Sequence, residues 1–204
     1  MDAPIIAEQE PMLRTLTLPE LISLQAKNPQ RSPEVQTEYS LRFWRLTTSY
    51  LIDYKAFCST MRDTGAVISG STALHFIFPY AEPPMEHCIR HDLDIYVKSM
   101  WAYDVVRHLA TTQGYTVSRS SSDPVNTGNT NRRPYTNLHG IDTVYVLEKG
   151  YFRIDVIASA REDSAIFPIL HFHSTLVMNI LTPNRFISID SFHYIQISCS
   201  KRGG

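Results

Sequence analysis

The run Asp92-Leu93-Asp94-Ile95-Tyr96-Val97 places two aspartates in a strongly alternating segment. Side chains at positions i and i+2 of a strand point to the same face, so we expect both carboxylates to project together while Leu93 and Ile95 face the core. Strands disfavour aspartate and adjacent like charges repel, and a bound divalent cation would offset both costs. Mg²⁺ prefers one or two carboxylates completed by substrate phosphates and water. The pair therefore predicts a magnesium site; the alternative is an exposed strand face that carries two acids.

A third acid, Asp155, interrupts the otherwise apolar strand-like run that extends from Arg153 to Ile157. A lone carboxylate inside such a strand is costly unless it is paired, hydrogen-bonded or bound to a metal. Asp155 is therefore a candidate third metal ligand. The alternative is a salt bridge between this carboxylate and an arginine.

The segment Val67-Ile68-Ser69-Gly70-Ser71-Thr72 has the pattern of a strand that turns directly into a helix. Glycine permits a tight turn and a close approach of the backbone to a ligand, and the first turn of a helix has free N–H groups. Such a turn can bind a phosphate, with the Ser71 hydroxyl as a further donor. We therefore expect Gly70 and Ser71 to bind phosphate, with ordinary turn chemistry as the alternative.

The three features together are more specific than any one of them. Acids on adjacent strands that face a phosphate-binding turn match the needs of two-metal phosphoryl transfer. In that chemistry the metal ions clamp the attacking and leaving oxygens, and a carboxylate can help to deprotonate the acceptor hydroxyl. The order Gly70-Ser71, Asp92 and Asp94, then Asp155 therefore predicts a phosphoryl-transfer site.

On these residues the sequence resembles the nucleotidyltransferase fold of the DNA polymerase β-like superfamily, and within it small uncharacterised fungal nucleotidyltransferase-like proteins. The likeness covers roughly residues 65–157 and continues more loosely to residue 181. It implies that Gly70 and Ser71 hold a nucleoside triphosphate (NTP) and that Asp92 and Asp94 bind two Mg²⁺ ions. Asp155 would bind one of these ions and help to activate the acceptor. The implied reaction transfers a nucleoside monophosphate from the NTP to a hydroxyl or similar group and releases pyrophosphate.

Two departures from the family pattern leave other functions open. Residues 72–91 form a longer spacer than the family usually has between its turn and its paired acids, and only residues 158–204 follow the catalytic-type sheet, where many relatives carry a helical domain. A non-catalytic nucleotide-binding or regulatory module is therefore the alternative function. A glycosyltransferase that uses Asp92 and Asp94 for its metal is disfavoured, because residues 1–65 have helical patterns instead of a dinucleotide-type α/β half.

Other groups could also bind a metal or an anion. His171 and His173 would share one face of a strand, and His87, Cys88 and His91 are closely spaced, but neither set has the spacing of a complete zinc site. A surface or structural role is the favoured interpretation of His171 and His173. His87, Cys88 and His91 are equally explained as part of a catalytic loop beside Asp92, in which His91 could hydrogen-bond to the acids. Arg132 and Arg133 could bind a phosphate, because the donors of a guanidinium group match the geometry of phosphate oxygens. The alternative for that pair is a solvated loop.

Helical and strand patterns surround these residues. Apolar, mostly aromatic side chains recur every three or four residues, and this stripe predicts one long helix from about Ser32 to Gly65. A shorter helix is expected over 19–26. Further helices are expected over 72–78, 99–114 and 164–170, and strand-like runs over 66–68, 91–97, 115–117, 143–147, 152–157, 176–181 and 186–189. Residues 118–140 are polar, a composition that is typical of a functional loop or of a disordered segment. The stripe consists of Tyr39, Phe43, Leu46, Tyr50, Tyr54, Phe57 and Met61.

These patterns predict an α+β fold with a small mixed sheet flanked by helices. The expected organisation is a helical N-terminal extension over 1–64, a nucleotidyltransferase-like domain over 65–190 and a C-terminal tail over 191–204. A hairpin is expected at Lys149-Gly150, between the two strand-like runs 143–147 and 152–157.

Composition limits the partners and the compartment. The 204 residues include 19 Lys+Arg and 20 Asp+Glu, a formal net charge of −1, and 43% are hydrophobic. Such a balance disfavours a surface that coats nucleic acid, so the expected acceptor is a small molecule or a protein rather than a long polynucleotide. The 3 cysteines suit free thiols. Neither a membrane span nor a signal peptide is apparent, which predicts an intracellular protein, cytoplasmic or nuclear.

Overall fold

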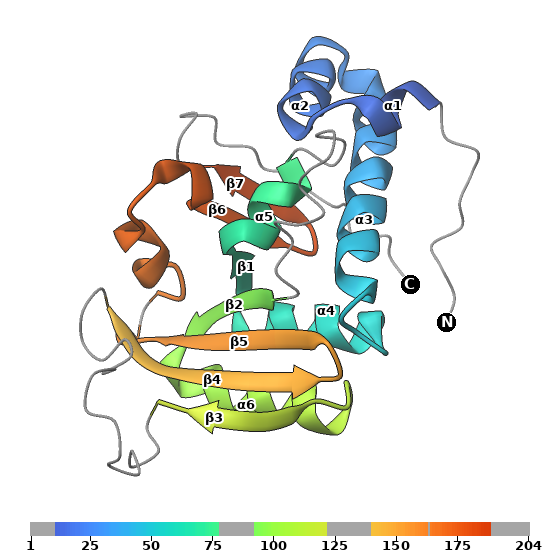
Figure 1. Ribbon diagram of the computed structural model, residues 1–204. Helices are drawn as coiled ribbons and strands as arrows, with labels where there is room; N and C mark the ends of the chain where they lie inside the picture. Colours follow the sequence, from blue (N-terminus) through green and yellow to red (C-terminus); the bar gives the residue numbers. More distant parts are fainter. Residues whose placement is uncertain (1–10, 78–91, 122–139, 163, 189–204) are drawn as a thin grey trace.

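Seven strands form one mixed sheet among the residues that the structure describes, in the spatial order β3-β4-β5-β2-β1-β6-β7 (Figure 1). The computed structural model describes residues 11–77, 92–121, 140–162 and 164–188. β2 runs parallel to β5, and the other neighbouring strands are antiparallel. The predicted α+β class is confirmed. The strands are β1 (Val67–Ser69), β2 (Asp92–Lys98), β3 (Thr116–Ser120), β4 (Ile141–Lys149), β5 (Phe152–Ser159), β6 (Asn179–Thr182) and β7 (Arg185–Ser188).

Helices flank this sheet, and those expected over 19–26, 72–78 and 99–114 are present within three residues of these bounds. The predicted hairpin joins β4 to β5, and Gly150 takes a positive φ of 59° in its turn. The expected helix over 164–170 is instead the short 3-10 helix η3. The helices are α1 (Pro11–Thr15), α2 (Leu18–Lys27), α3 (Ser32–Thr48), α4 (Tyr54–Thr64), α5 (Gly70–Ile77) and α6 (Ser99–Thr111), with 3-10 turns η1 (Pro29–Arg31), η3 (Phe167–His171) and η4 (Thr175–Val177).

The two faces of the sheet have different neighbours. Alternate residues of β2 and β5 point to the face that α6 covers, with α4 packed beside α6 (Figure 1). Leu93, Ile95, Ile154 and Val156 lie on that face and are fully buried in the main core. The intervening positions, including Asp94 and the residues in register with it, therefore point to the opposite face.

The predicted long helix over 32–64 is interrupted, and this expectation was wrong. α3 ends at Thr48 and α4 begins at Tyr54. The buried Gln113 side chain accepts hydrogen bonds from the backbone N–H groups of Ile52 and Asp53, at 2.8 and 2.9 Å, and donates one to the Asp53 carbonyl. A residue distant in sequence thus satisfies the backbone at the break, while the aromatic stripe stays on the core side of both helices.

The N-terminal helices share the main core with the sheet. Tyr39 of α3 packs edge-on against Phe76 of α5, with ring centroids 5.2 Å apart, and its hydroxyl donates to the Thr182 carbonyl at 2.9 Å. Residues 1–10 and the predicted tail over 191–204 lie outside the described residues. In the part of the chain that is described, every helix is too short or too polar to cross a bilayer.

Candidate active site

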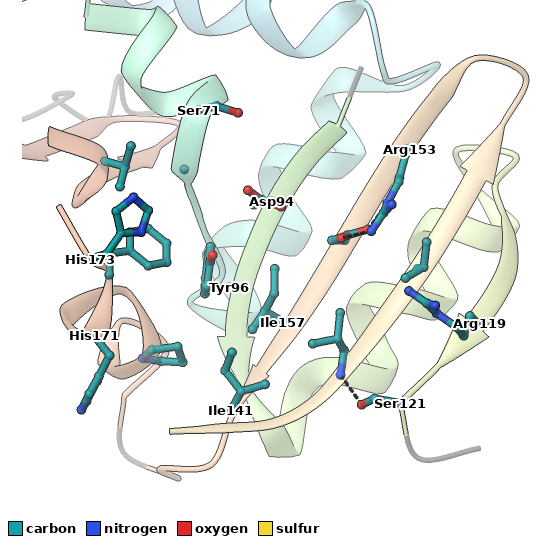
Figure 2. Close-up of a pocket in the computed structure, with 17 residues that line it drawn as sticks. Ser71, Asp94, Tyr96, Arg119, Ser121, Ile141, Arg153, Ile157, His171 and His173 are labelled. Atoms are coloured by element: carbon teal, nitrogen blue, oxygen red, sulfur yellow. Dashed lines mark hydrogen bonds and ion pairs between the residues drawn. The ribbon is translucent and has the colours of Figure 1, made fainter. Parts of the chain in front are cut away.

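A pocket of about 660 Å³ lies on the sheet face opposite α6 (Figure 2). Four strands form its floor, and the segment around η3 forms one wall. Four of the five residues predicted to do chemistry line this pocket, Asp92 being the exception. The described lining residues are Gly70, Ser71, Asp94, Tyr96, Arg119, Ser121, Ile141, Val144, Val146, Arg153, Asp155, Ile157, Pro168, His171, Phe172, His173 and Val177.

Asp94 and Asp155 are direct neighbours on the parallel strands β2 and β5, where each is the register partner of the other. The adjacency that the sequence predicted for these acids is present. Burial and, to a smaller extent, the nearby charges of Asp155 and Asp92 raise the pKa of Asp94 to about 7, although the positive charge of Arg153 opposes this rise. A pKa this high means that the site holds negative charge at a cost, which a bound cation would relieve.

Asp155 is not free, because Arg153 holds both of its oxygens. The Arg153 Nε donates to Asp155 Oδ1 at 2.7 Å, and a terminal guanidinium nitrogen donates to Oδ2 at 2.5 Å. The Asp155 side chain is 16% exposed and the Arg153 side chain 44%. The sequence had left open a metal ligand or an arginine partner for Asp155, and the structure contains the arginine pair.

Asp92 begins β2 and lies opposite Arg153 in the register of β5. Its carbonyl accepts a hydrogen bond from the Thr72 hydroxyl at 2.8 Å, which ties the strand to α5. Its carboxylate atom Oδ1 is buried and has no hydrogen-bond partner among the described residues. A buried carboxylate oxygen without a donor is a costly arrangement, and a cation at this point would satisfy it.

Gly70 brings α5 close to the acids. It takes a positive φ of 80°, and a Cβ at this position would overlap Oδ2 of Asp94. The close approach that the sequence predicted between this glycine and a ligand is therefore an approach to a carboxylate of the chain itself. Ser71 follows at the exposed start of α5, and Asp94 lies between Ser71 and Arg153 across one end of the pocket (Figure 2).

Arg119, which the sequence analysis missed, adds a second cation to the pocket. β3 and β4 lose register between Val117 and Arg119, and such bulges redirect side chains near functional sites. The exposed Arg119 guanidinium makes no hydrogen bond or ion pair with another described residue. No local sequence signal marks Arg119, because the bulge depends on pairing with β4. The arginines that the sequence did single out, Arg132 and Arg133, lie outside the described residues.

The histidines do not form the strand face expected for them. His171 ends η3 and His173 follows it in irregular structure, so their shared face was a wrong expectation. The His171 ring packs against the ring of Phe167, with centroids 4.7 Å apart, and Nδ1 lies 3.0 Å from the carbonyl of that residue. Both histidines still line the pocket, beside the aromatic pair Tyr96 and Phe172.

The donor set suits a hard cation completed by phosphates better than a protein-only metal site. Within the described ranges, no group of three or more His, Cys, Asp and Glu side chains is arranged to hold a metal ion. His87, Cys88 and His91 lie outside those ranges. Asp94, with its raised pKa, and Asp92, with its unpartnered oxygen, fit a site of one or two carboxylates for Mg²⁺.

Comparison with known proteins identifies no relative. No family model matches the chain, and neither a curated protein nor a solved structure matches it.

Proposed function

We propose that this chain is a Mg²⁺-dependent nucleotidyltransferase, which transfers a nucleoside monophosphate from an NTP to a small molecule or a protein. The observation that carries the proposal is the position of Asp94 and Asp155 as register partners in one pocket with the Gly70-Ser71 turn. The order of these residues along the chain resembles the nucleotidyltransferase fold. The pocket volume of about 660 Å³ suits a nucleotide-sized ligand.

Each group has a role in this proposal. Asp92 and Asp94 would hold Mg²⁺, which when bound polarises phosphoryl oxygens and neutralises the charge that develops on them. Gly70 and Ser71 would present the first turn of α5 to the phosphates. Asp155 would bind one of the metal ions and help to accept the proton of the acceptor hydroxyl once Arg153 releases it. Arg119 would pair with phosphate oxygens, since guanidinium donates two parallel hydrogen bonds to them.

The apolar side of the pocket supports a nucleotide as the ligand. Tyr96 and Phe172 pack edge-on with ring centroids 6.0 Å apart, and Ile141 and Val144 lie on the same floor. A ligand with a charged end and a flat, weakly polar end would match a pocket that is lined by acids and arginines as well as by aromatic and aliphatic side chains. A nucleoside triphosphate has this division.

A non-catalytic nucleotide-binding module is the second candidate, and one observation favours it. The acid that would activate the acceptor, Asp155, has both oxygens engaged by Arg153. If this pair persists in the complex with nucleotide, the chain binds an NTP without transferring it. Nucleotide binding is common to both functions, and transfer separates them.

Calorimetric titration with ATP, GTP, CTP and UTP in the presence of Mg²⁺ tests the proposal. We expect one NTP to bind in a Mg²⁺-dependent manner, and Asp94→Asn and Asp92→Asn to lose that dependence. Asp104→Asn is the matched control, because Asp104 pairs with Arg107 on the surface of α6. If wild type and the two site variants bind NTP with the same Mg²⁺ dependence, the assignment of Asp92 and Asp94 to a metal site is wrong. Transfer of α-³²P label to a component of a cell extract distinguishes the enzyme from the binding module.

A further inference from the structure

We propose that Arg153 is a built-in cation that occupies Asp155 until a metal–nucleotide complex arrives, so that metal and nucleotide bind this chain cooperatively. The inference depends on the proposed nucleotide site and adds a regulatory residue to it. Two ion pairs replace one in this exchange, because Asp155 passes from Arg153 to the metal and Arg153 passes from Asp155 to phosphate.

The geometry of the pair supports this exchange. Arg153 and Asp155 are two residues apart on β5 and point to the same face, and their two hydrogen bonds of 2.7 and 2.5 Å use both carboxylate oxygens. This fork-on-fork arrangement leaves neither oxygen of Asp155 open to a divalent ion while the guanidinium stays in place. A metal at Asp155 must therefore displace Arg153.

The position of Arg153 makes it suitable for the second half of the exchange. It lies opposite Asp92 across the β2–β5 ladder and lines the pocket with Asp94 and Ser71 (Figure 2). Its side chain is 44% exposed, so no packed core holds the guanidinium against Asp155. After displacement it remains beside the acids, where the phosphates of a metal-bound nucleotide would supply new oxygen partners.

Cooperativity follows from this competition. Without nucleotide, a metal that binds Asp155 leaves Arg153 unpaired next to a divalent charge, which weakens metal binding. With nucleotide, the phosphates accept the guanidinium and that penalty disappears. Linkage is reciprocal, so metal must strengthen nucleotide binding by the same factor. If Arg153 had only a structural role, its replacement would weaken the binding of both metal and nucleotide. If it competes with the metal, its replacement should instead strengthen metal binding in the absence of nucleotide.

Mn²⁺ titration followed by electron paramagnetic resonance measures the exchange, because the signal of free Mn²⁺ reports binding without catalysis. The probe nucleotide is α,β-methylene-ATP, or the corresponding analogue of whichever NTP binds, which cannot be cleaved at the reacting bond. We expect Arg153→Gln to bind Mn²⁺ alone about tenfold more tightly than wild type. Nucleotide should raise the Mn²⁺ affinity of both proteins, and we expect the factor of increase to be about tenfold smaller in this variant than in wild type.

Matched variants make the result specific. Arg107→Gln removes an arginine that also pairs with an aspartate, at 2.6 Å on the surface of α6, and should change neither affinity. Arg153→Lys keeps the charge but loses the fork, so its Mn²⁺ affinity should fall between those of wild type and Arg153→Gln. The lysine variant decides the question if the glutamine variant fails to fold, as checked by thermal unfolding.

The outcomes separate this inference from the proposed function. If wild type binds Mn²⁺ neither with nor without any nucleotide analogue, the proposed function fails and this inference with it. If wild type binds Mn²⁺ together with the nucleotide analogue, but the Arg153 variants bind Mn²⁺ without nucleotide no more tightly than wild type does, only this inference is overturned. Tighter binding of Mn²⁺ by Arg153→Gln together with a weaker response to nucleotide supports it.

Discussion

The carboxylate of Asp94 occupies the space in which a side chain on Gly70 would begin. Gly70 takes a positive φ of 80° at the junction of β1 and α5, and a Cβ built there would overlap Oδ2 of Asp94. The two residues are brought together because Ser69, directly before Gly70, is the register partner of Asp94 in the β1–β2 pair. The glycine thus leaves room for the acid to reach the start of α5.

Replacement of Gly70 by alanine should therefore be more harmful than an ordinary glycine substitution. The left-handed conformation costs alanine about 1 kcal/mol, and the overlap with Asp94 adds to this. We expect Gly70→Ala to lower the free energy of unfolding by about 2–4 kcal/mol in urea titration. The same change in an Asp94→Ala background should cost at least 1 kcal/mol less, because the overlapping group is gone.

Gly65 provides the comparison for this prediction. It ends α4 with a positive φ of 67°, and nothing lies within 4 Å of a Cβ built there. Gly65→Ala should therefore show only the conformational cost of about 1 kcal/mol, independent of Asp94. Equal losses for Gly65→Ala and Gly70→Ala would contradict the steric role of the carboxylate.

The pKa of Asp94 should make stability depend on pH. Burial and the neighbouring acids raise this pKa from 3.8 to about 7, so between these values the folded chain binds more protons than the unfolded chain. The free energy of unfolding contributed by Asp94 must then fall as pH rises from about 4 to about 7, and change little above that. The free energy of unfolding of Asp94→Asn should exceed that of wild type by about 1–3 kcal/mol at pH 8, and the two should be equal at pH 4.

Urea unfolding at intervals from pH 4 to pH 8, with a chelator present to exclude divalent ions, measures this difference. Asp104→Asn on the exposed face of α6 is the control, and its difference from wild type should stay constant over the same range. A constant difference for Asp94→Asn as well would show that the carboxylate is not buried with like charges around it. Addition of Mg²⁺ should stabilise wild type most near pH 8, where no proton competes for Asp94.

Local patterns in the sequence predicted the elements that carry the site. Alternation over 92–97 predicted β2 with Leu93 and Ile95 inward, and both are fully buried. Glycine at position 65 predicted the end of a helix, and it caps α4 in the left-handed conformation. These predictions succeeded because each depends on neighbours in the chain, through the period of a strand or the backbone freedom of one glycine.

Features that depend on distant contacts could not be predicted in the same way. The strand period already placed Arg153 and Asp155 on one face, but it did not decide whether an arginine or a metal would partner the carboxylate. Arg119 enters the pocket through a bulge that exists only against β4. His171 and His173 alternate as strand residues do, but η3 and the contact with Phe167 override that pattern.

A buried ion pair in α3 should be critical for the N-terminal helices. Arg42 donates to Glu38 at 2.8 Å and to the carbonyls of Leu13 and Leu16 at 3.0 and 2.7 Å. The side chains of the pair are 4% and 0% exposed. Arg42→Met would remove this donor from a buried carboxylate and from three carbonyls, those of Leu13, Arg14 and Leu16, so we expect the free energy of unfolding to fall by about 3–5 kcal/mol in urea titration.

Restoring apolar character on both sides tests the cause of that loss. Glu38→Leu combined with Arg42→Met removes the stranded charge, and most of the lost stability should return. Arg107→Met, which breaks an exposed pair, should change stability by less than about 0.5 kcal/mol. A double variant as unstable as Arg42→Met alone would assign the loss to the carbonyl contacts of the arginine rather than to the buried charge.

Gln113 should set the break between α3 and α4, which the aromatic stripe alone does not predict. Its amide makes three hydrogen bonds to the backbone of Ile52 and Asp53, at 2.8–2.9 Å, and its side chain is fully buried. Gln113→Ala would leave two N–H groups without their acceptor, at a cost of about 2–4 kcal/mol in urea unfolding. Gln25→Ala, which loses one part-buried bond to Ser32, should cost less than about 1 kcal/mol.

Amide hydrogen exchange localises the effect of Gln113→Ala. The backbone amides of residues 49–53 should lose protection in this variant, while those of β2 and β5 keep theirs. Unchanged protection at these residues would mean that the break is set within the two helices themselves.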